Sequence, residues 1–151
     1  KPRMSTTVGD LLRIKGAKAE TIAAAEPLLE AIRRMSEKHI GCLAVVTQAG
    51  KLSGILSERD VLWKVIAAGK SPKTHTVKDA MTPLKQMDTV TPAQTVEECM
   101  GLISGRRHRH LPVLADGKLV GMISIGDVVK FLLDAQQSTI DSLEKYITGT
   151  F

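Results

Sequence analysis

The sequence predicts a mixed α/β (α+β) fold built from two copies of one structural unit. Residues 21–43 recur as residues 89–111, and residues 50–61 recur as residues 117–128. Each copy has the pattern helix, strand, strand, helix, because apolar residues first follow helical spacing, then form two short runs around a turn, and then resume helical spacing. Since the repeat includes polar residues as well as apolar ones, it predicts a duplicated site as well as a duplicated core.

The first helix of each copy has one apolar face. Its residues are Leu28, Ala31, Ile32 and Met35 in the first copy and Val96, Cys99, Met100 and Ile103 in the second. Apolar runs at 43–46 and 52–56, and again at 111–114 and 119–123, flank glycine-containing turns, so each copy is expected to contain a β-hairpin. Pro112 has no N–H for a sheet ladder, which predicts a position at a strand start or edge.

The elements that follow and precede the hairpins also repeat. Ser57 and Ser124 occupy the expected starts of helices over 61–68 and 128–135. A short leader precedes each copy, at residues 7–12 and 76–81. We therefore expect a first repeat with its leader at 7–70, a second at 71–136, and a separate C-terminal amphipathic helix in 137–151, with Ile140, Leu143 and Ile147 on one face.

Composition is that of a soluble globular protein, with 43% hydrophobic and 25% charged residues. No apolar run approaches the roughly 20 residues that span a bilayer. We expect a cytoplasmic protein, or one in an organelle matrix if a transit peptide has been removed. Cys42 and Cys99 match no zinc-site or redox spacing, so two buried thiols in a reducing compartment are expected. The net charge of +5 alone does not identify a partner.

A hydroxyl and a carboxylate recur together after each hairpin, as Ser57 with Asp60 and Ser124 with Asp127. The amides of a helix start and a serine hydroxyl suit a phosphate, because the helix dipole is positive there. A carboxylate accepts hydrogen bonds from the neighbouring hydroxyls of a ribose. The pattern thus favours a nucleotide, and the structural alternative is a capping box in which the acid binds the amide of the serine.

These residues resemble a pair of CBS (cystathionine-beta-synthase) domains over residues 7 to 136. The resemblance is carried by the two Gly-x-x-Ser-x-x-Asp phrases from Gly54 and Gly121, by Leu-Pro-Val at 111–113, and by Asp-Ala-Met-Thr at 79–82. It implies two β-α-β-β-α units that pack sheet against sheet about a pseudo-twofold axis, with two clefts between them. In many members of this family the clefts bind AMP, ADP, ATP or NAD(H), and CBS pairs commonly form homodimers.

Carried over residue by residue, the resemblance implies that Ser57 and Asp60 serve one cleft and Ser124 and Asp127 the other. The backbone at residues 40–43 and 109–112, around the start of the first strand of each copy, would face adenine. Those segments contain Ile40, Gly41 and Cys42 in the first copy, and Arg109, His110 and Pro112 in the second.

A basic segment distinguishes the second copy, which has Arg106, Arg107, His108, Arg109 and His110 where the first copy has residues 38–42. Guanidinium groups bind phosphate bidentately, so we expect the second site to hold phosphate more strongly. Arg59 is a candidate to reach across the cleft, the alternative being an exposed arginine at a helix start. His108 and His110 alternate, but no cysteine or carboxylate lies at ligand spacing beside them, so no metal is expected.

The function favoured by the sequence is a non-catalytic adenine-nucleotide sensor that transmits its ligand state to a regulated protein partner. The alternative is a nucleic-acid-binding protein that uses the basic segment at 106–110, although stacking aromatic residues are missing nearby. An enzyme is disfavoured, because neither a Ser-His-Asp arrangement nor paired acids are evident. The apolar faces of the second helices and of the tail predict self-association, with a homodimer as the expected form.

Overall fold

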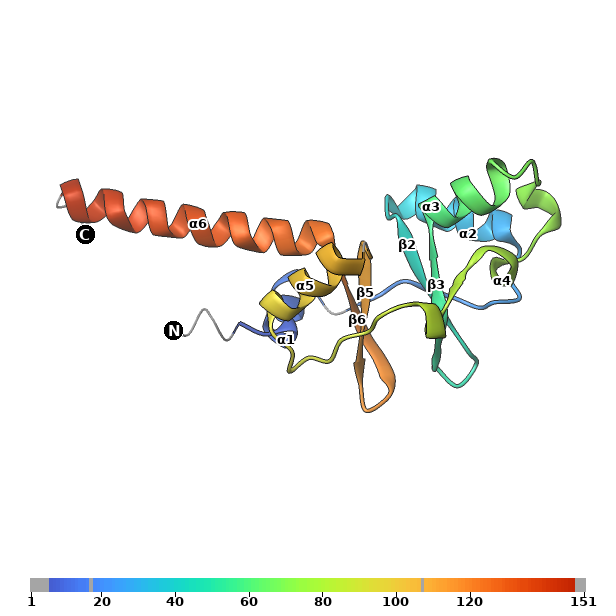
Figure 1. Ribbon diagram of the computed structural model, residues 1–151, viewed down its shortest axis with the longest axis horizontal. Helices are drawn as coiled ribbons and strands as arrows, with labels where there is room; N and C mark the ends of the chain where they lie inside the picture. Colours follow the sequence, from blue (N-terminus) through green and yellow to red (C-terminus); the bar gives the residue numbers. More distant parts are fainter. Residues whose placement is uncertain (1–5, 17, 107, 149–151) are drawn as a thin grey trace.

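The computed structural model describes residues 6–16, 18–106 and 108–148. Figure 1 shows the hairpins of the two copies next to each other in the middle of the molecule, with helices on both outer sides. The elements of the first half are α1 (Val8–Lys15), β1 (Thr21–Ile22), α2 (Leu28–Lys38), β2 (Cys42–Val46), β3 (Leu52–Ser57), α3 (Glu58–Asp60) and the π-helix η2 (Val61–Ile66). Those of the second are η3 (Pro72–Thr74), α4 (Val77–Ala80), β4 (Thr82–Pro83), η4 (Leu84–Gln86), α5 (Val96–Arg106), β5 (His110–Ala115), β6 (Lys118–Ser124) and α6 (Ile125–Thr148).

The predicted α+β fold with two hairpins is confirmed. The order of the first sheet is β1-β2-β3-β4, with β1 parallel to β2 and the other pairs antiparallel. The second sheet consists of the antiparallel pair β5–β6, and Val90 bridges it in parallel in the place of β1. Pro112 lies in β5, and its carbonyl accepts the amide of Val90 at 3.0 Å. The N–H that proline lacks would lie on this same side of β5, where only the isolated bridge to Val90 is present.

The two leaders cross over, and each attaches to the opposite copy. The amide of Val8 donates to Gln94 O at 2.8 Å, while at the matching position the amide of Val77 donates to Glu26 O at 2.9 Å. The isolated bridges Thr7–Thr95 and Pro27–Thr76 are matched in the same way. These matched contacts relate the two copies by a pseudo-twofold axis.

The hydrophobic core consists of two clusters that the leaders complete. One cluster combines α1 with the second copy and contains Val8, Leu11, Leu12, Val90, Val96, Cys99, Ile103, Leu111, Val113, Ile123 and Val128. The other combines α4 with the first copy and contains Ile22, Leu28, Ala31, Met35, Leu43, Val45, Leu56, Val65, Val77 and Ala80. The predicted division at residues 70 and 71 follows the sequence repeat, whereas the packing interleaves the two copies.

The C-terminal region differs from the sequence expectation, because one helix replaces two. The helix expected over 128–135 and the amphipathic tail helix join into α6, which is continuous over 24 residues. The connecting residues 134–138 contain neither glycine nor proline, so the chain has no reason to stop there. In Figure 1, α6 projects away from the rest of the molecule.

Gly54 is required where β4 approaches β3. A Cβ atom at this residue would lie 2.2 Å from the carbonyl oxygen of Thr82. We expect Gly54→Ala to push β4 away and to destabilise the fold by about 1–3 kcal/mol, measured by urea denaturation. Gly101→Ala in α5 is the matched control, because a Cβ there meets nothing and should stabilise by roughly 0.5–1 kcal/mol. Equal stability of the two variants would contradict this explanation.

Candidate functional site

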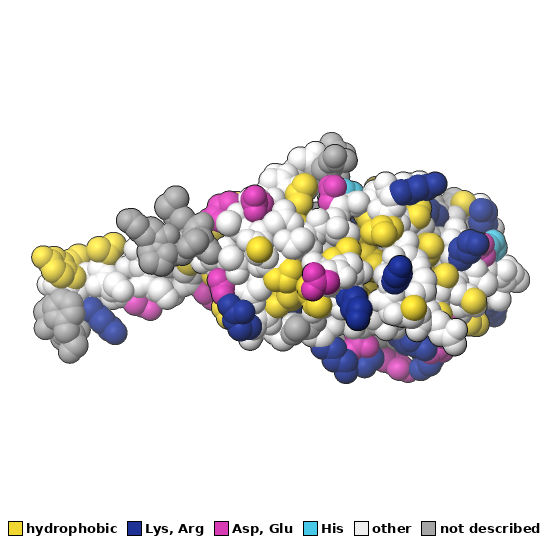
Figure 2. Space-filling model, turned by 90° about the horizontal axis from the view of Figure 1, so that it is seen from below, with side chains coloured by type: hydrophobic (Ala, Val, Ile, Leu, Met, Phe, Trp, Pro, Cys, Tyr) yellow, Lys and Arg dark blue, Asp and Glu magenta, His cyan; other side chains and the backbone are white. Residues whose placement is uncertain are grey.

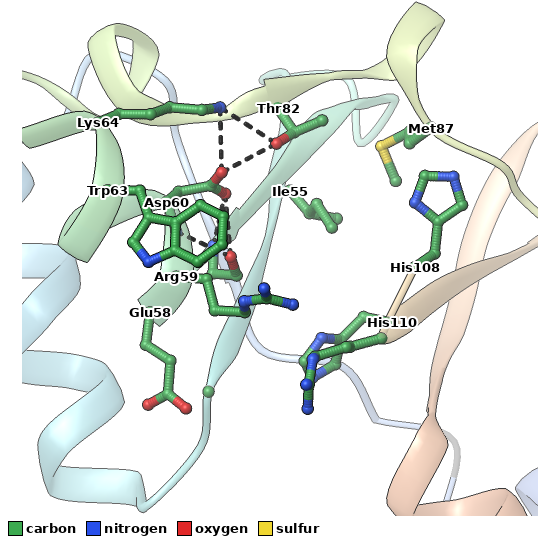
Figure 3. Close-up of a pocket in the computed structure, with 13 residues that line it drawn as sticks. Ile55, Glu58, Arg59, Asp60, Trp63, Lys64, Thr82, Met87, His108 and His110 are labelled. Carbon is green, nitrogen blue, oxygen red and sulfur yellow. Dashed lines mark hydrogen bonds and ion pairs between the residues drawn. The ribbon is translucent and has the colours of Figure 1, made fainter. Parts of the chain in front are cut away.

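A cavity of about 710 Å³ lies between the two copies and brings together residues from both. Figure 3 shows side chains from the first copy on one side of it and from the basic segment of the second on the other. Its lining consists of Gly41, Ile55, Ser57, Glu58, Arg59, Asp60, Trp63, Lys64, Thr82, Met87, His108, Arg109 and His110. Several residues predicted separately from the sequence therefore share one cleft.

Ser57 and Asp60 form the capping box at the start of the helix that follows β3. The amide of Ser57 donates to Asp60 Oδ2 at 2.9 Å, and the amide of Asp60 donates to Ser57 Oγ at 3.1 Å. Ser124 and Asp127 make the same two bonds, at 2.8 and 3.1 Å. The capping-box alternative is thus confirmed in both copies, and a role toward a ligand requires these groups to use further hydrogen-bonding capacity.

Asp60 is the most deeply buried charged side chain among the described residues, with 9% exposed. Its Oδ1 accepts a hydrogen bond from Thr82 Oγ1 at 3.0 Å and pairs with Lys64 Nζ at 3.0 Å, as drawn in Figure 3. The close approach at Gly54 holds Thr82 in this position. Thr82 ends the Asp-Ala-Met-Thr leader motif, but the sequence alone did not assign it to the site.

Asp127 has a different cation from its counterpart. Lys15 Nζ, at the end of α1, lies 2.7 Å from Asp127 Oδ2 and also donates to Met122 O at 2.8 Å. Burial acts to raise the pKa of Asp127, but the hydrogen bonds from Lys15 and Ser124, with the charge of Lys15, lower it overall. The acid predicted for the second cleft is therefore held charged by the last residue of α1, the helix that includes the first leader.

Arg59 and Trp63 lie together on the wall of the cleft. The Arg59 guanidinium stacks over the indole of Trp63, 4.7 Å from the ring centroid, which is a cation–π contact. Arg59 thus lines the cleft but contacts its own helix, and the predicted reach across the cleft stays a prediction. Trp63 is presented by η2, a π-helix, and such segments are frequent at functional sites. The sequence predicted a helix over 61–68, but not its π-helical form.

The basic segment lies beside Ser57 and Asp60, and its expected service to the second cleft stays a prediction. His108, Arg109 and His110 line the cavity, whereas Ser124 and Asp127 do not. His110 nevertheless pairs with Ser124 between β5 and β6, so the segment runs along the start of α6 as well. Arg107 and the side chain of Arg106 lie outside the described residues.

His108 and His110 have acidic neighbours. His108 Nε2 lies 3.2 Å from Asp88 Oδ2, an ion pair when the imidazole is protonated. Burial lowers the pKa of His110, and the nearby charges of Asp127 and Glu58 oppose this only in part. His110 therefore lies within electrostatic reach of one acid from each copy.

The first-copy segment at residues 40–42 reaches the cleft through Gly41. Gly41 lines the cavity, and its carbonyl accepts the amide of Glu58 at 2.9 Å. Ile40 packs against the core of the first copy, and Cys42 is buried opposite Ser57 in the β2–β3 ladder. Burial, followed by the charge of Asp60, raises the pKa of Cys42 to about 12.

The cleft combines charges of both signs with an excess of cations. Arg59, Lys64 and Arg109 face Glu58 and Asp60, and the two histidines can add positive charge on protonation. Such a surface suits an anionic ligand that also carries hydroxyl donors. Within the described residues, no group of three or more histidine, cysteine or acidic side chains could hold a metal ion. Among the helices described, none is both long and apolar enough to cross a membrane.

Comparison with known proteins identifies both copies. The family model described as "CBS domain" matches residues 8–67 and 77–134. The "CBS domain-containing protein CBSX3, mitochondrial" of Arabidopsis thaliana is 35% identical over 97% of this chain and 74% of that protein. A putative signal-transduction protein with CBS domains from Burkholderia ambifaria has 40% identity and a TM-score of 0.80, with 87% of this chain and 96% of that chain covered.

One similar structure contains a nucleotide. It is that of CBSX2 in complex with AMP, which has 28% sequence identity and a TM-score of 0.70, with 87% of this chain and 98% of that chain covered. The match extends over both copies of the repeat and hence over the region in which the cleft lies.

The two thiols should be unreactive in the folded protein. Burial raises the pKa of Cys99 to about 11, with a smaller effect of the Glu98 charge, and the pKa of Cys42 is higher still. Because the thiolate is the reactive form, neither should react with a disulfide reagent at pH 8 until denaturant is added. Rapid modification of either thiol under native conditions would contradict this expectation.

The Lys15–Asp127 pair should stabilise the protein only where Asp127 is charged. The lowered pKa of Asp127 means that the contribution is complete above the unfolded value of about 3.9 and is lost as the pH falls through the lower folded value. We expect Lys15→Met to cost up to about 1 kcal/mol at pH 7, since the pair is partly exposed. The cost should shrink in acid, measured by urea denaturation, with Lys118→Met at the exposed start of β6 as control. A cost independent of pH would contradict the assignment.

Proposed function

The chain belongs to the CBS-domain family, and on this premise we propose that it is a non-catalytic regulatory module that binds an adenine nucleotide. AMP is the first candidate, followed by ADP and ATP, with NAD(H) as a further possibility. The proposed site is the cleft lined by Ser57, Asp60 and Arg109. The observation that carries this proposal is the convergence of the serine–aspartate phrase of one copy with the basic segment of the other in one cavity.

The size and chemistry of the cleft support a nucleotide. Its volume of about 710 Å³ falls in the range of small-molecule sites. Arg109 and Arg59 supply positive charge for phosphate, and Ser57 supplies a hydroxyl and a helix start. The AMP complex of a similar protein supports this ligand class.

Binding of ribose at Asp60 requires an exchange of partners. Its carboxylate already accepts hydrogen bonds from Ser57 and Thr82 and pairs with Lys64. We propose that ribose hydroxyls replace Lys64, whose ammonium then turns toward the phosphate. Such an exchange links ligand binding to the leader that holds Thr82, because Lys64 also donates to Ala80 O at 3.2 Å.

Transmission of the signal follows from where the cleft lies. A ligand that contacts both copies favours one arrangement of the two halves over another by its differential affinity for them. We propose that a second protein, or a second copy in a homodimer, responds to this difference. Occupancy of a second cleft at Ser124 and Asp127, and a cytoplasmic or matrix location, stay predictions.

Nucleic-acid binding receives less support than nucleotide binding. The described part of the basic segment lines a cleft, where His108 contacts Asp88, and a groove for a polynucleotide would need an open track of cations and aromatic residues.

Calorimetric titration of the protein with AMP, ADP, ATP and NADH tests the proposal. We expect Arg109→Ala to weaken binding of the preferred nucleotide by roughly tenfold, because a charge-assisted hydrogen bond is lost from an exposed residue that the fold does not need. Arg13→Ala, an exposed arginine on α1, is the control. Failure of all four nucleotides to bind at millimolar concentration would refute the function.

A matched pair of serines tests the choice of cleft. Ser57→Ala and Ser124→Ala each remove one equivalent cap, so each should cost about 0.5–2 kcal/mol of stability. We expect only Ser57→Ala to weaken nucleotide binding. If Ser124→Ala weakens it more, the nucleotide binds in the other cleft.

A further inference from the structure

The outer part of α6 is exposed to solvent, apart from a groove that Phe131, Ala135 and Ser138 line together with α1. Every residue from 132 to 147 is exposed, and Figure 1 shows this part of the helix projecting from the body. Isolated helices shorter than about 12–15 residues are only marginally stable in water, and in proteins most of the stability of a helix comes from packing of its apolar face. The exposed aliphatic residues of this helix therefore indicate that this face packs against a partner.

The exposed surface of α6 has a heptad pattern. Leu133, Ile140 and Ile147 repeat every seven residues, as do Val129, Gln136 and Leu143, and the two series are four residues apart. These are the spacings of the a and d positions of a coiled coil. All five aliphatic residues are between 44% and 79% exposed. Figure 2 shows hydrophobic side chains on this extension, outside the body of the protein.

The a and d positions together form a seam along α6, and its two flanks carry different residues. One flank, the e positions, has Lys130, Gln137 and Glu144, again seven residues apart. The other flank, the g positions, has Leu132, Thr139 and Tyr146, of which Leu132 is 39% and Tyr146 75% exposed.

The flanks distinguish between orientations of a partner helix with the same sequence. In an antiparallel pair, e faces e and g faces g, whereas in a parallel pair e faces g. Antiparallel pairing places Lys130 opposite Glu144 of the second helix, and Leu132 opposite Tyr146 of the second helix. Parallel pairing would place the charged flank against the apolar one. In the antiparallel arrangement Leu133 meets Leu143 of the second helix and Ile147 meets Val129, so the a and d positions pair about the same centre as the flanks.

We propose that α6 forms an antiparallel two-helix coiled coil with α6 of a second copy, centred near residues 137–139. This placement rests on the proposed homodimer and assigns its interface. It buries the aliphatic seam and pairs opposite charges on one flank, with Gln136 as the one polar seam position. The two nucleotide-binding bodies lie at opposite ends of the paired helices.

A membrane surface fits α6 less well than a second copy does. Helices that lie on anionic lipid have lysine and arginine on their polar face. The polar face here contains Asp134, Asp141 and Glu144 against Lys130 and Lys145, which is a net negative charge.

Sedimentation equilibrium of the full-length chain tests the seam. We expect the wild-type protein to be a dimer, and Ile140→Asp to raise its dissociation constant at least about tenfold, because a charge would be buried in the seam. Ser142→Asp is the matched control, since it introduces the same charge two residues away on the outer face of the helix. A wild-type monomer would overturn the homodimer, while a dimer that survives Ile140→Asp would overturn only the α6 interface. Neither result bears on nucleotide binding, which calorimetry measures separately.

Charge exchange tests the orientation. Lys130→Glu or Glu144→Lys alone places like charges opposite each other twice in an antiparallel dimer, and each should weaken association severalfold. The double variant restores both opposite-charge pairs, so its dissociation constant should return close to the wild-type value. If the effects of the two substitutions simply add, the antiparallel register is wrong.

Discussion

The exchange of leaders between the two copies is the constraint on which the remaining structure depends. Val8 in α1 and Val77 in α4 are completely buried, and each lies in the core of the copy to which it does not belong in sequence. Because burial of such side chains contributes about 1.5–3 kcal/mol each, neither copy has its full core alone. The cleft exists because this exchange fixes the hairpins side by side, and the same exchange places Lys15 and Thr82 at the two aspartates.

Much of the fold could be predicted from the sequence because its signals are local and occur twice. The hairpins followed from short apolar runs around glycine turns, and the first helices from one apolar face. The serine–aspartate phrase was recognisable because a capping box and a ligand site use the same residue types. The join within α6 was missed because an amphipathic pattern alone does not tell whether two helical segments share one axis.

The site was harder to predict because its residues come together through long-range packing. Thr82 reaches Asp60 only through the pairing of β4 with β3, and no spacing in the sequence encodes that contact. The basic segment was expected at the second cleft because it belongs to the second copy. Its side chains also line the cavity at Ser57 and Asp60, while His110 pairs with Ser124, so the segment is near both serine–aspartate motifs.

The π-helix η2 has a consequence for how the two copies can diverge. Its wider turn is recorded by the amide of Ala67, which donates to Leu62 O five residues back at 2.8 Å, whereas the second copy continues as a regular α-helix from Asp127. The change of helical pitch begins directly after the shared aspartate. Side chains beyond it, such as Trp63 in one copy and Lys130 in the other, are therefore rotated differently about the helix axis. A duplicated gene can in this way acquire two ligand preferences while its common framework stays unchanged.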